Sequence, residues 1–450
     1  MSAKSALELL NCYNNHVDTE AIVGRPYLPR MIDSALQEIL HGVGAVIIEG
    51  PRGCGKTMSA LNAANSYIFL DTPHAKEIFD FQPELLLRGD TPRLLDEWQV
   101  IPESWNLVRR EVDGRAERGR FILTGSALPA DDITRHTGAG RFLRLTQQTM
   151  TTCEKDQVLG KGSSMPSISL RNLFAGEFPD LFPGQDDPTS AINLLCRPGF
   201  PDMLYDDFSL SSRRISAYID EVTRLDLSRL AEIRHSPQVI KAVLQSVARS
   251  VISELTIDTI RRDIMRLAAE IQNRTISNYL ELLGRIFVVQ EIPAWLPQLR
   301  TRARLRTASK YHLADPAMAV NLLGTTPTQL AYDPKTLGLI LESAVLHDLH
   351  TLISFLGGRL YHYRDSSGRE IDGIVTLPDG RWAGIEVKLG TAKISQAGQK
   401  LQEIVNTLDL EVMKKPSFLA VVTLAGPIAK LTKLENDVPT FTFPIQALGV

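Results

Sequence analysis

The run GPRGCGKT, from Gly50 to Thr57, has the most specific chemistry in this sequence. Lys56 can reach the β and γ phosphates of a nucleotide, and the hydroxyl of Thr57 can hold Mg²⁺. A glycine turn can arise by chance, but here a β-branched strand precedes the run and a helical pattern follows it. The run therefore predicts a P-loop that binds ATP and Mg²⁺. The glycines that let its backbone turn N–H groups toward phosphate oxygens are Gly50, Gly53 and Gly55.

An acidic pair follows further along the chain, at the end of the apolar run RLLDE. We expect Asp96 to hold Mg²⁺ through water and Glu97 to polarise the water that attacks the γ-phosphate. Such pairs are also common on solvated helix surfaces. The position directly after an apolar strand favours the catalytic role.

Polar and basic residues also follow two later apolar runs. Thr124 and Ser126 end the run FILTGS, where they can sense the γ-phosphate or orient water. Arg141 opens the run RFLRLT, which we predict to be a further strand. The sequence thus assigns catalytic roles to residues that lie far apart in the chain.

The elements that must position these residues are short apolar strands alternating with helices. Ala45 to Glu49 and Tyr67 to Leu70 would be the first two strands, and the runs named above would follow. This alternation predicts an α/β fold with a parallel sheet and a ligand at the carboxyl ends of its strands.

These motifs resemble those of the AAA+ ATPases, in particular the bacterial and archaeal group with a C-terminal restriction-endonuclease-like domain of unknown function. The resemblance is carried by GPRGCGKT, LLDEWQ with the later Trp105, ILTGS and the pair Gly140–Arg141. It implies that Glu97 is the catalytic glutamate and that Thr124 or Ser126 is the first sensor. Arg141, with Arg135 as a competitor, is a candidate arginine finger for a neighbouring subunit. A ring, most simply a hexamer, is implied.

Bulk composition limits the class of protein. The 450 residues are 44% apolar and 22% charged, which predicts a folded chain of about three domains. The net charge of -3 gives no overall attraction to DNA or to an anionic membrane. The cysteines form no CxxC pair, and no stretch reads as a signal peptide or membrane span. We therefore predict a cytoplasmic protein without membrane contact.

The middle of the chain reads as helical. The resemblance implies a helical lid near residues 198–230, in which Arg213, Arg214 and Arg224 compete as second sensor. From Pro237 to Gln290, a succession of helical patterns followed by a β-rich run predicts a winged helix.

The run LRTRARLRT carries alternating arginines that would share one face of a strand. This cationic strip predicts contact with DNA phosphates, although exposed edge strands also carry basic residues. Nothing in the run predicts base-specific recognition. The arginines are Arg300, Arg302, Arg304 and Arg306.

The last part of the chain predicts a helix, a hairpin and a further strand that together resemble the PD-(D/E)xK nuclease superfamily. Asp372 lies near the end of one strand, while Glu386 and Lys388 share a face of the next. Glu342 lies on the preceding helix. The resemblance implies that the carboxylates bind Mg²⁺, Asp372 and Glu386 foremost, and that Lys388 assists an attacking water. The same fold can also serve as a DNA clamp or platform without cleavage.

The full prediction is an ATPase that converts ATP and water to ADP and phosphate and drives work on branched or duplex DNA. By analogy of domain order it resembles Holliday-junction branch-migration motors such as RuvB. The alternative is a nucleotide-dependent signalling or defence switch whose C-terminal domain is the effector or a structural platform. The predicted domains are an ATPase domain (1–160), a linker and lid (161–235), a winged helix (236–328) and a nuclease-like domain (329–450).

Overall fold

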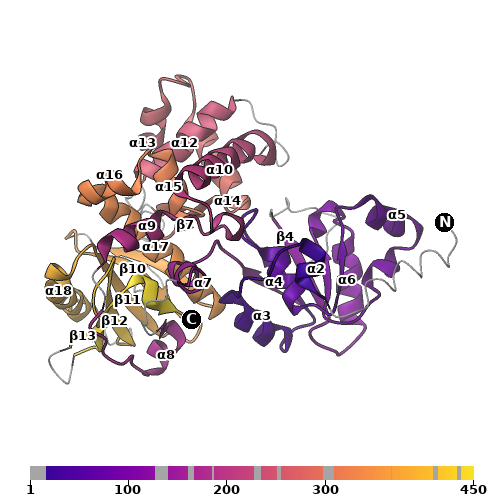
Figure 1. The fold of residues 1–450 in the computed structure, drawn as a ribbon, viewed down its shortest axis with the longest axis horizontal. Helices are drawn as coiled ribbons and strands as arrows, with labels where there is room; N and C mark the ends of the chain where they lie inside the picture. The colour runs from indigo at the N-terminus through magenta and orange to yellow at the C-terminus, as the bar shows by residue number, and fades with distance from the viewer. Residues whose placement is uncertain are drawn as a thin grey trace. The chain divides into compact units, whose positions relative to one another are not determined.

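The structure is a computed structural model of the chain. It forms two compact units, Met1–Gln148 with Arg285–Phe287 and Thr149–Gly284 with Val288–Val450, which we call unit 1 and unit 2 and describe separately (Figure 1). The residues that the structure describes are 17–126, 140–160, 167–184, 187–227, 235–250, 255–296, 309–365, 367–408, 414–432 and 437–450.

Unit 1 is built on a parallel sheet in the strand order β2-β3-β4-β1-β5. This confirms the predicted parallel α/β arrangement and brings β4 between β1 and β3. Its strands are β1 (Ala45–Glu49), β2 (Ser66–Phe69), β3 (Arg93–Asp96), β4 (Phe121–Gly125) and β5 (Phe142–Thr146). Its helices are α2 (Thr19–Val23), α3 (Ile32–Leu40), α4 (Lys56–Ala63), α5 (Pro73–Phe81), α6 (Ser104–Asp113) and the short turns η1 (Pro83–Leu87) and η2 (Trp98–Val100).

The central strands β1, β3 and β4 of unit 1 are buried on both faces of the sheet. Strand β1 is buried along its whole length, as expected of a central parallel strand. On one face Ile47, Leu95 and Leu123 pack with Trp98 and Trp105 in a single apolar cluster. Helices α3 and α4 pack against β1. The core therefore fixes the carboxyl ends of β1, β3 and β4 side by side.

Unit 2 begins with helices. They are α7 (Thr152–Val158), α8 (Leu170–Ala175), α9 (Pro188–Cys196), α10 (Phe208–Glu221), α12 (Pro237–Arg249), α13 (Ile257–Ile264), α14 (Asn273–Arg285), α15 (Pro316–Leu322), α16 (Pro327–Tyr332) and the turns η3 (Pro201–Met203) and η4 (Val222–Asp226). After α14 the antiparallel strands β7 (Val289–Ile292) and β8 (Lys310–Leu313) form a ribbon. The order of helices and ribbon is the one that the sequence predicts. The arginine strip lies between β7 and β8, outside the described residues, as does Arg135.

The C-terminal part of unit 2 is a mixed sheet in the order β13-β14-β12-β11-β10-β9. Helix α17 (Pro334–Phe355) packs on β9, β10 and β11, and α18 (Ile394–Asn406) packs on β11, β12 and β14. The strands are β9 (Arg359–Arg364), β10 (Glu370–Thr376), β11 (Trp382–Lys388), β12 (Phe418–Thr423), β13 (Ala429–Lys430) and β14 (Thr440–Pro444), with the turns η6 (Thr391–Lys393) and η7 (Ile445–Ala447). A separate short pair joins β6 (Ile168–Ser169) to β15 (Leu448–Gly449).

Helix α17 is long and apolar enough to cross a membrane by length and composition alone. However, 72% of its most apolar window is buried inside the protein, as is usual for a helix at the core of a folded domain. A Cβ at Gly373 on β10 would lie 3.0 Å from a methyl group of Leu346 on α17, so the helix and the strand pack closely there. The helix is therefore part of the core of unit 2.

The observed division differs from the predicted domain boundaries. Helix α7 was expected in the ATPase domain, but it packs on α9 and η7, both of which belong to unit 2. The predicted lid, winged helix and nuclease-like domain all fall within this one unit. The reason is physical: α15 contacts α9, α10, α12 and α17, so one core runs through all three predicted parts.

A buried histidine makes the stability of unit 2 depend on pH. His312 on β8 is fully buried, and its ring lies 5.9 Å from that of His350. Burial, together with His350 and His347, lowers the pKa of His312 well below its usual value. As the pH falls through about 6.5, His312 therefore binds a proton in the unfolded chain but stays neutral in the folded chain.

We predict that the urea midpoint of unit 2 falls as the pH drops below about 6.5, because only the unfolded state gains the proton. The His312→Leu variant should show a shallower fall, measured by tryptophan fluorescence between pH 5 and 8. The matched control is His41→Leu, because the His41 ring is exposed and meets water in both states. An unchanged pH slope in His312→Leu would contradict the prediction.

Candidate functional site

The phosphate-binding run joins the buried strand β1 to helix α4. Gly50 has φ 154°, and a Cβ there would lie 2.0 Å from the carbonyl oxygen of Gln147. Gly55 has φ 101° and forms the N-cap of α4, so the helix begins at Lys56 with its first N–H groups unpaired within the helix. Both positions require glycine, which explains their place in the motif.

Lys56 is folded back onto its own loop. Its side chain is buried, and its Nζ donates to the carbonyl oxygens of Gly50 at 3.0 Å and Pro51 at 2.9 Å. These carbonyls hold the ammonium group at the mouth of the loop. A phosphate group would offer the same ammonium group a stronger, charged partner.

Asp96, at the end of β3, accepts hydroxyl groups from two other elements. Its Oδ1 accepts from Thr57 Oγ1 at 2.9 Å and from Thr124 Oγ1 at 2.5 Å. Burial raises the pKa of Asp96 to about 6, although both hydroxyl donors act against this rise. The sequence predicted a role for each of these residues, and the structure brings the three together.

Glu97 follows Asp96 in a left-handed backbone conformation, with φ 55°. Its N–H donates to Thr124 Oγ1 at 3.0 Å, which fixes the turn. Its carboxylate Oε2 accepts from Ser126 Oγ at 3.2 Å and from the side-chain amide of Gln99. Ser126 therefore contacts the glutamate, while Thr124 contacts both acids.

A further set of residues supports the phosphate loop from behind, and sequence reasoning missed it. Arg30 donates to the carbonyl oxygen of Cys54 at 2.7 Å and to that of Gln148 at 3.0 Å. Gln147 donates to the same Cys54 carbonyl at 3.3 Å and to Ser59 Oγ at 3.1 Å. These contacts span large sequence separations and follow no motif, so only the fold reveals them.

Arg141 lies just before β5 and pairs with Asp113 at the end of α6. Strand β5 runs parallel to β1, and its residue Phe142 pairs with Ala45 at the start of β1. Arg141 therefore lies at the amino ends of the strands, whereas the phosphate loop of its own chain lies at their carboxyl ends. Arg144, farther along β5, instead pairs with Glu49, the residue before the loop.

The carboxylates of the C-terminal part also come together, and lysines accompany them. Lys388 Nζ and Lys400 Nζ both donate to Glu386 Oε1, at 2.8 and 2.9 Å. Asp372 Oδ2 accepts the backbone N–H of Val387 at 2.8 Å. Burial, and then the charge of Glu386, raises the pKa of Asp372. Burial, and then the charge of Asp372, likewise raises the pKa of Glu342.

Lys310 is an addition to this cluster that the sequence did not predict. Its Nζ donates to Glu370 Oε1 at 2.7 Å and lies 3.5 Å from Glu342 Oε1. Burial alone lowers the pKa of Lys310, but the neighbouring carboxylates outweigh it and raise the pKa above its usual value. Its position after the arginine strip gave no hint of a contact with α17 and β10.

The C-terminal carboxylates do not fit the predicted metal site. Within the part of the chain that the structure describes, no group of three His, Cys, Asp or Glu side chains is arranged to hold a metal ion while the lysines are in place. Glu386 and Glu342 instead contact ammonium groups. In unit 1, by contrast, the hydroxyl of Thr57 and the carboxylate of Asp96 lie side by side next to the phosphate loop, and such hard oxygen donors suit Mg²⁺.

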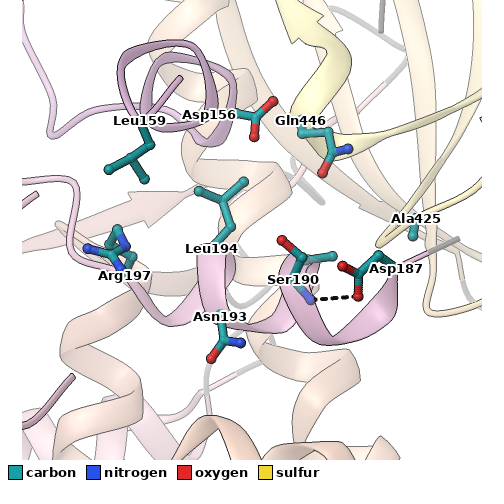
Figure 2. Close-up of a pocket in the computed structure, with 10 residues that line it drawn as sticks. Asp156, Leu159, Asp187, Ser190, Asn193, Leu194, Arg197, Ala425 and Gln446 are labelled. Atoms are coloured by element: carbon teal, nitrogen blue, oxygen red, sulfur yellow. Dashed lines mark hydrogen bonds between the residues drawn. The ribbon is translucent and has the colours of Figure 1, made fainter. Parts of the chain in front are cut away.

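A polar pocket in unit 2 lies between α7, α9 and the C-terminal residues (Figure 2). Its volume is about 80 Å³, far below the roughly 300 to 1,000 Å³ of most small-molecule sites. Arg197 lines it but already donates to the carbonyl oxygens of Leu204 and Asp206, and Asp187 caps α9 through the N–H of Ser190. The pocket is too small for a nucleotide.

Three family models match successive parts of the chain. Residues 43–164 match the model described as AAA domain. Residues 189–329 match Domain of unknown function (DUF8612), and residues 337–426 match Domain of unknown function (DUF4143). The first match includes the phosphate loop, Asp96 at the end of β3 and Glu97 after it.

The match to the AAA domain spans the whole parallel sheet of unit 1. It supports the predicted P-loop ATPase domain, whose phosphate loop would lie between β1 and α4. The predicted nuclease-like domain coincides with a family whose function is not described.

The relatives that match most of the chain have no described activity. Uncharacterized proteins of Mycobacterium bovis (strain ATCC BAA-935 / AF2122/97) and Mycobacterium tuberculosis (strain ATCC 25618 / H37Rv) are each 26% identical over 371 residues, which is 80% of this chain and 74% of theirs. Among solved structures, a Walker-type ATPase of Pyrococcus abyssi has 14% identity and a TM-score of 0.38, covering 66% of this chain and 98% of its own. The Aeropyrum pernix ORC1 protein in complex with DNA has 15% identity and a TM-score of 0.26, covering 69% of this chain and 94% of its own. Likeness at these TM-scores carries no inference about this chain.

We predict that Lys56→Ala lowers the affinity of the AAA-type domain for ATP at least tenfold, because the loop loses the ammonium group that its carbonyls hold in place. Binding of a fluorescent ATP analogue measures the change. The control is Lys76→Ala, an exposed lysine on α5 of the same domain, which should bind as wild type. Equal affinity of Lys56→Ala and wild type would contradict the assignment of the loop.

Proposed function

We propose that this protein hydrolyses Mg-ATP and uses the cycle to do work on DNA in the cytoplasm. The observation that carries the hydrolysis proposal is the pair of hydroxyls on Asp96 Oδ1. These two hydrogen bonds connect Asp96 to α4, which carries Thr57, and to β4, which carries Thr124. A nucleotide on the loop would thus lie beside both acids.

The roles of the residues follow from their positions. Bound Mg²⁺ would neutralise phosphate charge, held by Thr57 directly and by Asp96 through water. Lys56 would leave its carbonyl partners for the β and γ phosphates. Glu97 would accept a proton from the attacking water, and Gln99 and Ser126 hold its carboxylate in place meanwhile.

The arginine of a neighbouring subunit completes this proposal. Arg141 lies away from its own loop and is partly exposed, so it suits a contact with the nucleotide of the next subunit in a ring, most simply a hexamer. Its pairing with Asp113 would have to open for this purpose.

The DNA part of the proposal rests on unit 2. The order α12, α13, α14 and a β7–β8 ribbon is that of a winged helix, and the alternating arginines belong to the segment that connects the ribbon strands. Cationic side chains on such a segment would contact phosphates without reading bases. The substrate would be duplex or branched DNA, with the C-terminal sheet as a clamp.

A nucleotide-dependent signalling or defence switch is the second candidate. It is favoured by the C-terminal cluster, whose carboxylates contact lysines and so suit a structural platform as well as a DNA clamp. A switch would hydrolyse ATP at a rate that DNA does not change.

For hydrolysis, we predict that Glu97→Gln keeps ATP affinity but lowers turnover by roughly 100-fold or more, because the amide cannot accept the proton. A phosphate-release assay measures turnover, and the fluorescent analogue measures binding. Glu77→Gln, which alters an exposed glutamate of α5, serves as the control and should match wild type. Full turnover in Glu97→Gln would remove the glutamate from the mechanism.

For DNA, we predict that forked, duplex or four-way DNA raises the ATPase rate at low salt. Replacing the arginine strip (Arg300, Arg302, Arg304 and Arg306) by alanine should abolish that stimulation and leave the basal rate unchanged. The variant should also show a smaller salt dependence of DNA binding, because fewer phosphates are neutralised. The control replaces Lys76, Arg88, Arg115 and Arg118, all exposed in unit 1, and so removes the same positive charge away from the proposed DNA contacts. An ATPase rate indifferent to all three DNAs would favour the switch.

A further inference from the structure

The carboxylates of the C-terminal cluster are balanced by lysines from three different elements. Lys310 comes from β8, Lys388 from β11 and Lys400 from α18. Lys310 contacts Glu370 and Glu342, whereas the other two lysines share Glu386 Oε1. The cluster therefore carries its own positive charges, placed by the fold.

Lys310 differs from the other two lysines in its burial. Its side chain is 3% exposed, against 29% for Lys388 and 43% for Lys400. It is also fixed at both ends, because its backbone pairs with Ile292 in the ribbon while its Nζ donates to Glu370. Lys388 and Lys400 are partly in contact with water, whereas Lys310 is enclosed beside its carboxylates.

We propose that the ammonium group of Lys310, held by Glu342 and Glu370, is the resident cation of this part of the cluster and that it excludes a divalent metal ion from Glu342 and the neighbouring Asp372. An ammonium group and a divalent ion would compete for the same carboxylates. Two cations bound to one carboxylate would also repel each other. In consequence the C-terminal part carries out no metal-dependent cleavage in wild-type protein.

Among the described residues, one carboxylate oxygen of the cluster has no hydrogen-bond partner that an incoming cation would have to displace. Glu386 Oε2 is buried and has no hydrogen-bond partner in the described part of the chain, and the Glu386 side chain is only 2% exposed. Asp372 keeps one oxygen beyond the one that accepts Val387 N–H. Removing the ammonium group of Lys310 would leave Glu342 and Glu370 without their cation and able to accept another.

The test measures Mn²⁺ binding to full-length, nucleotide-free protein by the loss of the free-ion signal in electron paramagnetic resonance. Lys310→Met keeps the length of the buried stem and removes the charge. We expect this variant to gain a bound Mn²⁺ that disappears in Lys310→Met/Asp372→Asn. Wild type and Asp372→Asn should bind equal amounts of Mn²⁺, so that any ion at Thr57 and Asp96 cancels in each comparison.

The controls separate charge from position. Lys310→Arg keeps a cation and should gain no ion, and Lys400→Met removes an exposed lysine from the same cluster and should gain none either. The proposal is overturned if wild type binds an ion that Asp372→Asn abolishes, or if folded Lys310→Met gains no ion. Circular dichroism monitors folding, and should Lys310→Met not fold, Lys310→Gln takes its place in the same comparison.

This inference concerns the C-terminal cluster alone and stands apart from the proposed function. ATP turnover of each variant is measured in parallel, because a loss of turnover would concern unit 1 rather than the cluster. Linear and four-way DNA incubated with Mg²⁺ should stay intact with wild-type protein. Cleavage that Asp372→Asn abolishes would overturn the proposal.

Discussion

The acceptance of two hydroxyl groups by one carboxylate oxygen organises the nucleotide site. Asp96 is at the end of β3, Thr124 at the end of β4 and Thr57 at the start of α4, and the parallel sheet brings all three ends to one edge. Burial raises the pKa of Asp96 to about 6, and in the described part of the chain the hydrogen bonds to its Oδ1 come from hydroxyl groups rather than from a cation. The loop, the turn at Glu97 and the contacts of Ser126 and Gln99 all depend on this edge.

The C-terminal cluster also contains buried carboxylates, but it compensates them with cations instead of hydroxyl groups. Both sites place carboxylates where water is scarce, and an unpaired charge there is unfavourable. In unit 1 hydroxyls accompany the carboxylate and leave room for an incoming cation. In unit 2 the chain supplies lysines, and Lys310 reaches the cluster from an element remote in sequence. One chain therefore contains an acidic site whose carboxylate accepts hydroxyl groups and an acidic cluster whose carboxylates contact lysines.

Sequence reasoning succeeded where the determining contacts are local. The strands of unit 1, the phosphate loop and the order of α12 to β8 follow from periodicity and glycine placement over short windows. It failed where contacts join distant residues. Arg30 supports Cys54, and Lys310 reaches Glu370, yet neither arginine nor lysine belongs to a motif. The packing of α7 on α9 and η7 likewise follows no motif.

Cys54, within the phosphate loop, gives the protein a built-in reporter. Its thiol is fully buried and donates to the carbonyl oxygen of Gln147 at 3.2 Å. A reagent can therefore reach it only when the phosphate loop moves away from Gln147. Burial raises the pKa of Cys153 and of Cys196 to about 12, which makes both poor nucleophiles and lowers the background from described thiols. The alkylation rate of Cys54 would then follow the opening of the loop in unlabelled wild-type protein, and nucleotide that holds the loop closed would slow it.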